Sequence, residues 1–140
     1  MTNISTDTKH IKAVVLRFYE PFRTGDTSIY EEILAPEWVN HPAEPGTPPG
    51  PAGAPPVGTY RHILPDLQSV TEAMIAEGDL VAVRTTHRGT HSAEFLGIPA
   101  TGRRIELRTQ DVHRLADGRI IETWHLEDFA GLRQQLTTAA

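Results

Sequence analysis

A lone aspartate stands near the end of the segment RIELRTQDVHR, which otherwise alternates apolar or neutral residues with charged ones. Read as an extended strand, this segment places Ile105, Leu107, Thr109 and Asp111 on one face. A carboxyl group at the end of an apolar row loses hydration, which favours its neutral form and raises its pKa toward the range used in general acid/base catalysis. Asp111 is therefore a candidate acid/base. The alternative is a half-exposed aspartate, or one paired with an arginine.

Seven histidines are a second source of chemistry. His87 and His91 share one face of the preceding extended segment, but they are about 13 Å apart along a strand and so cannot share one metal ion. A metal site that combines one of them, or His41, with His125 and Asp111 stays an alternative. We expect no metal.

Two tryptophans and two polar residues are candidates for substrate contacts. Trp38 lies in EWVNHP and Trp124 in IIETWHL, and such large aromatics either fill a core or stack on a ligand. Asn40 and His41 come directly before a segment rich in proline and glycine, where they are placed to reach the mouth of a cavity.

Other kinds of chemistry find no support in the sequence. The chain has no cysteine, which excludes disulfides, thiolate metal sites and a cysteine nucleophile. Ser92 lacks the G-x-S-x-G elbow of a serine hydrolase, and GIPATG lacks the spacing and lysine of a phosphate loop. The net charge of −5 argues against a nucleic-acid partner, which requires a concentrated basic face.

The length and composition of the chain indicate one globular domain. A chain of 140 residues with 39% hydrophobic and 22% charged residues fits a single globular domain over residues 1–140. No apolar run approaches the roughly 20 residues that span a bilayer, so no membrane partner is expected. The first ten residues, MTNISTDTKH, do not resemble a secretory signal, and the cytoplasm is the expected location.

Two helices are expected near the N-terminus. Residues 7–24 form an amphipathic helix, because five apolar residues recur at helical spacing: Ile11, Val14, Val15, Phe18 and Phe22. Gly25 is suited to end it, and Pro21 should kink or end its last turn. A second, short helix follows, with Ser28 and Glu31 at the spacing of a capping box.

Residues 42–58, PAEPGTPPGPAGAPPVG, are too rich in proline and glycine for regular helix or paired strand. A loop of this length in a compact domain is either functional or mobile. It is therefore either a lid or rim of a cavity, or a disordered excursion on the surface.

The rest of the chain is dominated by strand patterns. After a short helical stretch at 60–64, alternating and β-branched residues predict four strands, at 68–77, 80–91, 103–115 and 119–126. Gly78-Asp79 and Asp117-Gly118 mark hairpin turns, and a closing helix follows Asp128. This order predicts an α+β fold in which N-terminal helices cover one face of a strongly curved antiparallel sheet that encloses a pocket.

Two segments, GTHSAEFLGIPATGRR and DVHRLADGRIIETWHLEDFAGLRQQL, give the chain a family resemblance. It resembles the SnoaL-like polyketide cyclases, also called ester cyclases, of the NTF2-like superfamily, most specifically over residues 68–136. The resemblance implies a cone-shaped barrel with a deep pocket, a homodimer or homotetramer, and no metal or organic cofactor. The proline- and glycine-rich segment is longer than the usual connection in the family.

The resemblance also implies roles for individual residues. Asp111 occupies the position of the family's acid/base in an intramolecular aldol ring closure. His91 falls on the GTH motif, His41 on the N-H-P motif and Trp124 on the E-x-W motif, which makes them pocket residues.

The leading hypothesis is a cofactor-independent enzyme that acts on an apolar, carbonyl-bearing small molecule. Asp111 removes a proton α to a carbonyl, and His91 or Asn40 stabilises the enolate. The expected substrate-binding residues are Trp38, Asn40, His41, His87 and Trp124. One alternative is a binding module without catalysis. Another is an NTF2-like isomerase or hydrolase, for which Glu122 and Arg84 are candidate additional groups.

Overall fold

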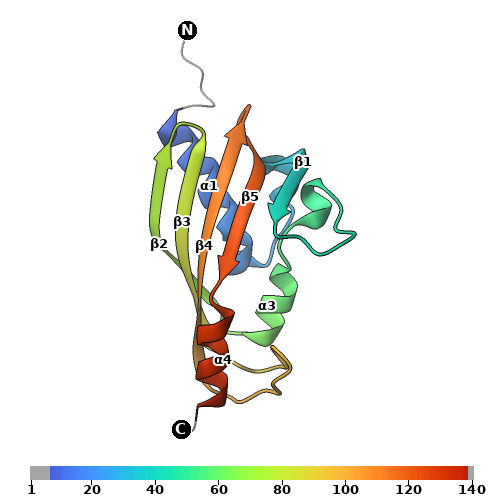
Figure 1. The fold of residues 1–140 in the computed structure, drawn as a ribbon, viewed down its shortest axis with the longest axis vertical. Helices are drawn as coiled ribbons and strands as arrows, with labels where there is room; N and C mark the ends of the chain where they lie inside the picture. Colours follow the sequence, from blue (N-terminus) through green and yellow to red (C-terminus); the bar gives the residue numbers. More distant parts are fainter. Residues whose placement is uncertain (1–6, 139–140) are drawn as a thin grey trace.

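A curved sheet of five strands forms the frame of the molecule (Figure 1). The computed structural model describes residues 7–138. The strands lie in the order β1-β5-β4-β3-β2, with β1 parallel to β5 and the other neighbours antiparallel. Their bounds are β1 Leu34–His41, β2 Gln68–Glu77, β3 Leu80–Thr90, β4 Arg104–Ala116 and β5 Arg119–Glu127.

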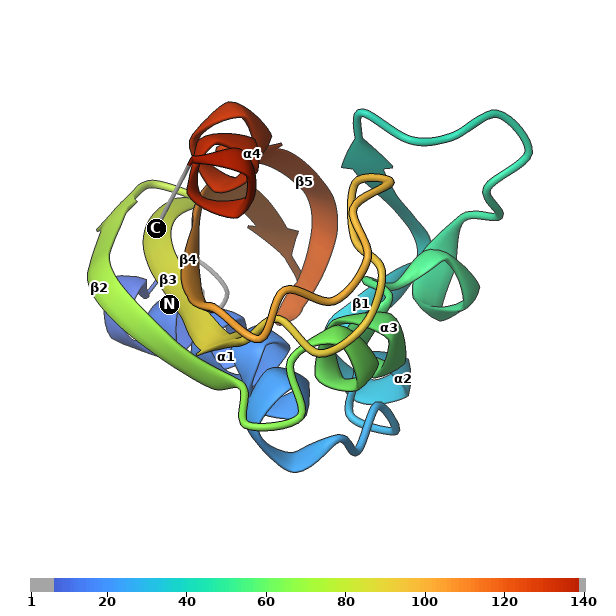
Figure 2. The ribbon, with the colours of Figure 1, turned by 90° about the horizontal axis from the view of Figure 1, so that it is seen from below.

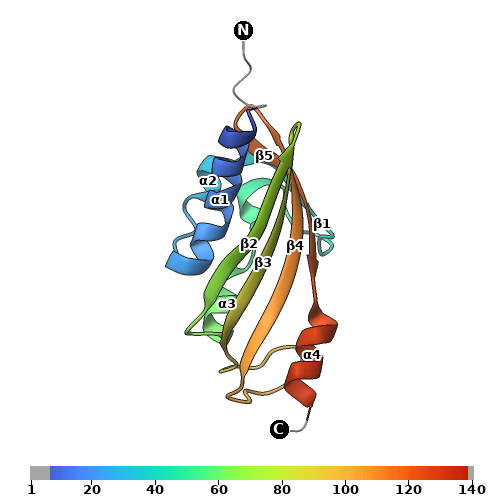
Figure 3. The same ribbon diagram turned by 90° about the vertical axis from the view of Figure 1, so that its left-hand side faces the viewer.

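Within the described residues, four α-helices and one 3-10 turn accompany the sheet. They are α1 Thr8–Thr24, α2 Tyr30–Ile33, η2 Gly50–Gly53, α3 Val57–Ile63 and α4 Phe129–Thr137. Seen end-on, the sheet is strongly curved, and α1, α2 and α3 lie toward its concave side (Figure 2). The side view shows α1 along one face of the sheet and α4 at the end far from the start of α1 (Figure 3). The predicted α+β fold with a curved sheet and N-terminal helices is confirmed.

The first helix has the bounds and the buried face that its sequence predicts. The Asp7 side chain caps its start by accepting a hydrogen bond of 2.9 Å from the Lys9 N–H. Gly25 ends it in the left-handed region, with φ of 80°. Pro21 does not end the helix, which continues to Thr24.

Two apolar clusters hold the helices to the sheet. The larger one packs α1 and α2 against the inner face of the sheet, with Phe18, Tyr30 and Trp38 among its buried members. The smaller one joins α3 and α4 to the first half of β4 through Ile105 and Leu107. Removal of this apolar surface from water stabilises both contacts.

The strand patterns translate into the observed sheet almost unchanged. The bounds of β2 match the prediction, those of β3 and β5 differ from it by one residue at one end, and β4 begins and ends one residue later than predicted. The alternation in β4 is as predicted, with every second residue from Ile105 to Leu115 buried. Both hairpin turns form, and Gly78, Asp117 and Gly118 take the positive φ values that such turns require.

The prediction of four strands was wrong, because β1 adds a fifth at the edge beside β5. Its sequence, LAPEWVNH, contains Pro36 and lacks regular alternation, and its register with β5 shifts between Leu34 and Val39. Proline is tolerated at an edge, where one side of the strand has no neighbour. A parallel strand of this kind leaves no hairpin signal in the sequence.

The predicted capping box at Ser28 and Glu31 was also wrong. The cap residue of α2 is Ile29, which has no capping side chain. The Ser28 N–H instead bonds to Asp26 Oδ1 at 2.9 Å, which forms a local turn before the helix.

The segment 42–58 is largely without regular structure, as predicted, apart from the 3-10 turn and the first residues of α3. The segment contacts the rest of the fold at Gly50, which is buried against the backbone of Pro36 in β1. Within residues 7–138, no helix combines the length and apolar character needed to cross a membrane.

Candidate active site

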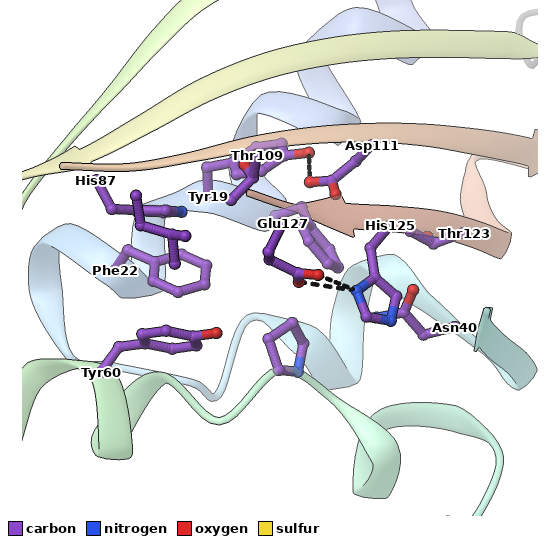
Figure 4. A pocket seen from close by; sticks show the side chains of 13 residues that line it. Tyr19, Phe22, Asn40, Tyr60, His87, Thr109, Asp111, Thr123, His125 and Glu127 are labelled. Atoms are coloured by element: carbon purple, nitrogen blue, oxygen red, sulfur yellow. Dashed lines mark hydrogen bonds and ion pairs between the residues drawn. The ribbon is translucent and has the colours of Figure 1, made fainter. Parts of the chain in front are cut away.

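A cavity lies between α1, the concave face of the sheet and the start of α3 (Figure 4). Its space measures about 520 Å³, its open mouth included. The lining combines aromatic rings with several ionisable groups: Phe18, Tyr19, Phe22, Asn40, Pro55, Tyr60, His87, Leu107, Thr109, Asp111, Thr123, His125 and Glu127. An apolar space with a few convergent polar groups is the usual form of a small-molecule site.

Asp111 stands at the centre of this polar group. Only 9% of it is exposed, and burial raises the pKa of its carboxyl to about 6. The Tyr19 hydroxyl donates a hydrogen bond of 2.7 Å to Asp111 Oδ2, which opposes that rise (Figure 4). The negative charge of Glu127 adds to the rise. The result is a carboxyl group that exchanges its proton near neutral pH, as a general acid/base must.

Tyr19 connects this carboxyl to the interior of the protein. Its hydroxyl oxygen lies 2.8 Å from His113 Nε2, on the side away from the cavity lining. Burial and the neighbouring Asp111 raise the pKa of the Tyr19 hydroxyl well above its ordinary value. Tyr19 therefore stays protonated and acts as a donor to the carboxylate.

His125 faces Asp111 from the next strand and carries two hydrogen bonds. Its Nδ1 lies 2.8 Å from Glu127 Oε1, and its Nε2 lies 2.7 Å from the Pro42 carbonyl oxygen. Both partners are acceptors, so both bonds form together when the ring carries two protons. Burial alone would lower the pKa of His125, but these bonds and the charges of Glu127 and Asp111 raise it. The surroundings of His125 thus favour its imidazolium form near Asp111.

Four further side chains supply neutral polar groups. Burial raises the pKa of Tyr60 to about 12, so its hydroxyl remains a donor. Burial lowers the pKa of His87 to about 4, and its Nδ1 lies 2.7 Å from Ser69 Oγ. Asn40 Oδ1 and Thr109 Oγ1 are buried with no hydrogen-bond partner within residues 7–138. Unpaired buried polar groups are costly, and in a cavity lining they suit polar groups of a ligand.

Comparison with known proteins places this geometry in a family. Residues 13–136 match the family model of the SnoaL-like polyketide cyclases. The chain belongs to the SnoaL-like polyketide cyclase family. It is 29% identical over 127 residues to the aklanonic acid methyl ester cyclase DauD of Streptomyces sp. (strain C5), an alignment that covers 88% of this chain and 79% of DauD.

Solved structures of similar proteins agree with this membership. Wild-type IdmH from Streptomyces antibioticus is 34% identical, with a TM-score of 0.76 over 90% of this chain and 97% of IdmH. TsrD from Streptomyces laurentii is 26% identical, with a TM-score of 0.83 over 95% of this chain and 98% of TsrD. The likeness extends over almost the whole length of both chains.

In this SnoaL-like protein, three of the predicted catalytic and substrate-binding residues line the cavity: Asp111, Asn40 and His87. Trp38 lies behind the lining, where it is 1% exposed and its Nε1–H donates to Thr123 Oγ1.

His91 lies outside the cavity lining. It is fully buried at the end of β3, where its Nδ1 accepts a hydrogen bond of 3.1 Å from the Thr101 N–H. The Nε2 atom has no partner within the described residues. His91 thus packs against the segment that connects β3 to β4.

His41 and Trp124 lie side by side on β1 and β5, outside the lining of the cavity. Their rings stack with centroids 5.7 Å apart, and His41 Nε2 lies 2.8 Å from Glu122 Oε2. Trp124 is 37% exposed, and the Arg114 guanidinium lies over its ring. Neither His41 nor Trp124 contributes to the lining of the cavity.

The groups considered for other reactions are also elsewhere. Glu122 lies within hydrogen-bond distance of His41 and pairs with Arg114, and Arg84 lines a groove on the outer face of the sheet. Neither residue lines the cavity. Across residues 7–138, no three histidine, aspartate or glutamate side chains are grouped closely enough to hold a metal ion.

Sequence reasoning missed Tyr19, Tyr60 and Glu127 as cavity residues, and it considered His125 only as a ligand in the alternative metal site. A signal existed for Tyr19, because it follows Val15 by four residues on the buried face of α1. His125 and Glu127 alternate on β5, as residues on one face of a strand do. Which face they share depends on the register with β4, which the sequence does not display.

Proposed function

We propose that this protein is a cofactor-independent cyclase that closes a ring by an intramolecular aldol reaction, with Asp111 as the acid/base. The observation that carries the proposal is the position of Asp111, a buried carboxyl group in the cavity with its pKa raised to about 6. Near neutral pH such a group is an available base, and its conjugate acid is strong enough to return the proton.

The reaction can be written with Asp111 as the sole proton carrier. The Asp111 carboxylate removes a proton from the carbon α to a carbonyl, and the electrons of that C–H bond move into the enolate. The enolate carbon then bonds to a second carbonyl carbon of the same molecule, whose C=O π electrons become an alkoxide. The alkoxide takes the proton back from Asp111. The carboxylate is regenerated, and the product is an isomer of the substrate.

Other lining groups are suited to stabilise the negative charge that forms. The Tyr60 hydroxyl and the Asn40 amide make no hydrogen bond within residues 7–138, so both can donate to an enolate or alkoxide oxygen. The His125 imidazolium is held by Glu127 and Pro42 and contributes positive charge. We assign the enolate-stabilising role to Tyr60 and Asn40, since His91 lies outside the lining.

The lining also supports a class of substrate. Phe18, Phe22 and Tyr60 present aromatic rings to the cavity, which suits a flat, largely apolar molecule. The relative DauD is named as an aklanonic acid methyl ester cyclase. We therefore propose a carbonyl-bearing polyketide ester as the substrate.

We also infer that the protein is a homodimer or homotetramer. Apolar side chains gather on the outer face of the sheet, where Ile75 is 68% and Leu126 71% exposed. A second copy packed on this face would remove them from water. Sedimentation of the purified protein tests this inference, and a monomer at micromolar concentration would contradict it.

Turnover by Asp111→Asn tests the catalytic proposal, with aklanonic acid methyl ester as the first candidate substrate. We expect the rate of ring closure to fall by at least about a hundredfold, in line with the loss of a general acid/base. Asp79→Asn is the matched control, since Asp79 is paired with Arg114 away from the cavity. Undiminished turnover by a folded Asp111→Asn would overturn the assignment. Tight binding of the ester without any conversion by the wild type would indicate a binding protein.

A further inference from the structure

We propose that Trp38, Thr123 and His113 position Tyr19 through a hydrogen-bond chain of fixed direction, so that Asp111 exchanges its proton with a substrate only through Oδ1. This inference deepens the proposed function and rests on it. Trp38, Thr123 and His113 act here as positioning residues, and none of them is assigned contact with the reacting atoms.

The chain runs without a gap from the core to the cavity. Trp38 Nε1 lies 2.9 Å from Thr123 Oγ1, and Thr123 Oγ1 lies 2.8 Å from His113 Nδ1. His113 Nε2 lies 2.8 Å from the Tyr19 hydroxyl oxygen, which lies 2.7 Å from Asp111 Oδ2. All five residues are at most 9% exposed, so water does not compete for these bonds.

The indole of Trp38 sets the direction of the chain, because its N–H can only donate. Thr123 Oγ1 accepts that bond, and its own hydrogen is then free to point to His113 Nδ1. A neutral imidazole that accepts at Nδ1 carries its proton on Nε2, from which it donates to the Tyr19 oxygen. The Tyr19 hydrogen is left to point to Asp111 Oδ2. Each donor in the chain therefore has one acceptor.

The opposite direction leaves a group unsatisfied. If Asp111 donated from Oδ2 to Tyr19, then Tyr19 would donate to His113 Nε2, and His113 would donate from Nδ1 to Thr123. Thr123 Oγ1 would then accept from both His113 and Trp38, and its own hydrogen would have no acceptor within residues 7–138. An unsatisfied buried hydroxyl is costly, so the first direction is favoured. A charged His113 is disfavoured too, since complete burial lowers its pKa to about 3.

The direction of the hydrogen-bond chain determines which carboxyl oxygen of Asp111 exchanges a proton with the substrate. Asp111 Oδ2 accepts from Tyr19 whether the carboxyl group is charged or neutral, so the proton that is gained and lost resides on Oδ1. Oδ1 has no hydrogen-bond partner within the described residues, and Asp111 lines the cavity. The chain keeps the same arrangement when Asp111 takes the proton and when it returns it. No reorganisation of the core accompanies turnover.

The tautomer of His113 tests the direction without any substrate. Nitrogen-15 NMR of the wild-type protein distinguishes the two ring nitrogens, and we expect a neutral ring protonated on Nε2 from pH 5 to pH 8. A ring protonated on Nδ1, or one that takes up a second proton in this range, would overturn the proposal. This measurement needs no variant and so does not depend on how any substitution folds.

Two substitutions at Thr123 test the coupling to Asp111. Thr123→Val removes the bonds to Trp38 and His113, so the Nδ1–H tautomer of His113 becomes populated and Tyr19 turns away from Asp111. The titration midpoint of the Asp111 carboxyl, followed by carbon-13 NMR, should then rise by about half a pH unit, since a hydrogen bond of ordinary net strength corresponds to about 0.7 unit. Thr123→Ser keeps the hydroxyl and should restore the wild-type midpoint.

Thr85→Val is the matched control. Thr85 is 1% exposed, as Thr123 is, but its hydroxyl has no hydrogen-bond partner in the described part of the chain and it does not line the cavity. If Thr123→Val moves the Asp111 midpoint no more than Thr85→Val does, the positioning role is refuted. These titrations are independent of turnover. A shifted Asp111 midpoint in Thr123→Val, together with an active Asp111→Asn, would refute the proposed function but still support the hydrogen-bond chain.

Discussion

Asp111 and His125 face each other across β4 and β5. A regular hairpin continued from its turn would place Trp124 opposite Asp111. The register shifts by one residue between the turn and this point, because Ile121 is an extra residue in β5 without a partner in the ladder. Since successive side chains point to opposite faces, this single residue turns His125 into the cavity and Trp124 away from it.

The position of His125 predicts an effect on the acidity of Asp111. His125→Gln removes a positive charge that lowers the pKa of the Asp111 carboxyl, so that pKa should rise above about 6. In a plot of ring-closure rate against pH, the acidic limb should move to higher pH. His62→Gln, a change at an exposed histidine, serves as the control. An unmoved limb in His125→Gln would show that the two groups are not electrostatically coupled.

Removal of the Tyr19 hydroxyl should act in the same direction. The hydrogen bond from Tyr19 favours the charged form of Asp111, so Tyr19→Phe should raise the pKa of Asp111, by roughly one unit for a bond to a charged acceptor. The variant also leaves His113 Nε2 without its partner, which should lower the free energy of unfolding by about 1–3 kcal/mol. Carboxyl NMR and urea denaturation measure the two effects separately. A pKa that stays at its wild-type value would contradict this account of Tyr19.

Asp111→Asn should stabilise the protein at neutral pH although it removes activity. The folded pKa of about 6 exceeds the ordinary value of 3.8, so the folded state binds more protons between these values and wild-type stability falls as pH rises through this range. Asparagine does not ionise and avoids the penalty. The full difference of about 2.2 pKa units corresponds to about 3 kcal/mol, which is an upper limit for the gain at pH 7.

The comparison of two pH values isolates this effect. At pH 4 Asp111 is largely neutral in the folded state and about half neutral in the unfolded state, so the variant and the wild type should differ much less there than at pH 7. His87 and His113, with folded pKa values of about 4 and about 3, make both proteins less stable as pH falls below 6.5. That loss is common to both and cancels in the difference. An equal difference at pH 4 and pH 7, measured by urea denaturation, would refute a buried, ionisable Asp111.

The sequence predicts most of the sheet because the β4 pattern is strong. Alternation from Ile105 to Leu115 determines which residues face inward, and Asp111 follows from that pattern alone. The turn at Asp117-Gly118 is equally local, since both residues must adopt positive φ. These features depend on neighbours in the chain and are readable without knowledge of the tertiary structure.

The partners of Asp111 depend on contacts between distant segments, and the sequence does not show them. Tyr19 reaches the carboxyl group from a helix 92 positions away. His125 reaches it through a bulge, which has no marker such as glycine in IIETWHL. The pairing of β1 with β5 places Trp38 beside Thr123, although β1 has no hairpin that would indicate its neighbour.

The proline- and glycine-rich segment gives a last prediction, through its contact with β1. Gly50 has φ of 76°, and a Cβ atom there would lie 2.5 Å from the Pro36 carbonyl oxygen. Gly46 in the same segment has φ of 85°, but a Cβ atom would meet nothing within 4 Å. Gly46→Ala should therefore lower the free energy of unfolding by only about 1 kcal/mol, which is the cost of placing alanine in the left-handed region. Gly50→Ala should lower the free energy of unfolding by at least about 2 kcal/mol more than Gly46→Ala does, because the backbone must move to relieve the clash.

That movement should also reach the cavity. Pro55 lines it, and the Pro42 carbonyl oxygen accepts the hydrogen bond from His125, so both ends of the segment contribute to the site. Gly50→Ala should weaken binding of aklanonic acid methyl ester, measured by calorimetry, whereas Gly46→Ala should leave it unchanged. Equal affinity in the two variants, with Gly50→Ala folded, would show that this segment does not shape the binding site. A selective loss would identify it as a structural rim of the cavity, held in place by its contact with β1.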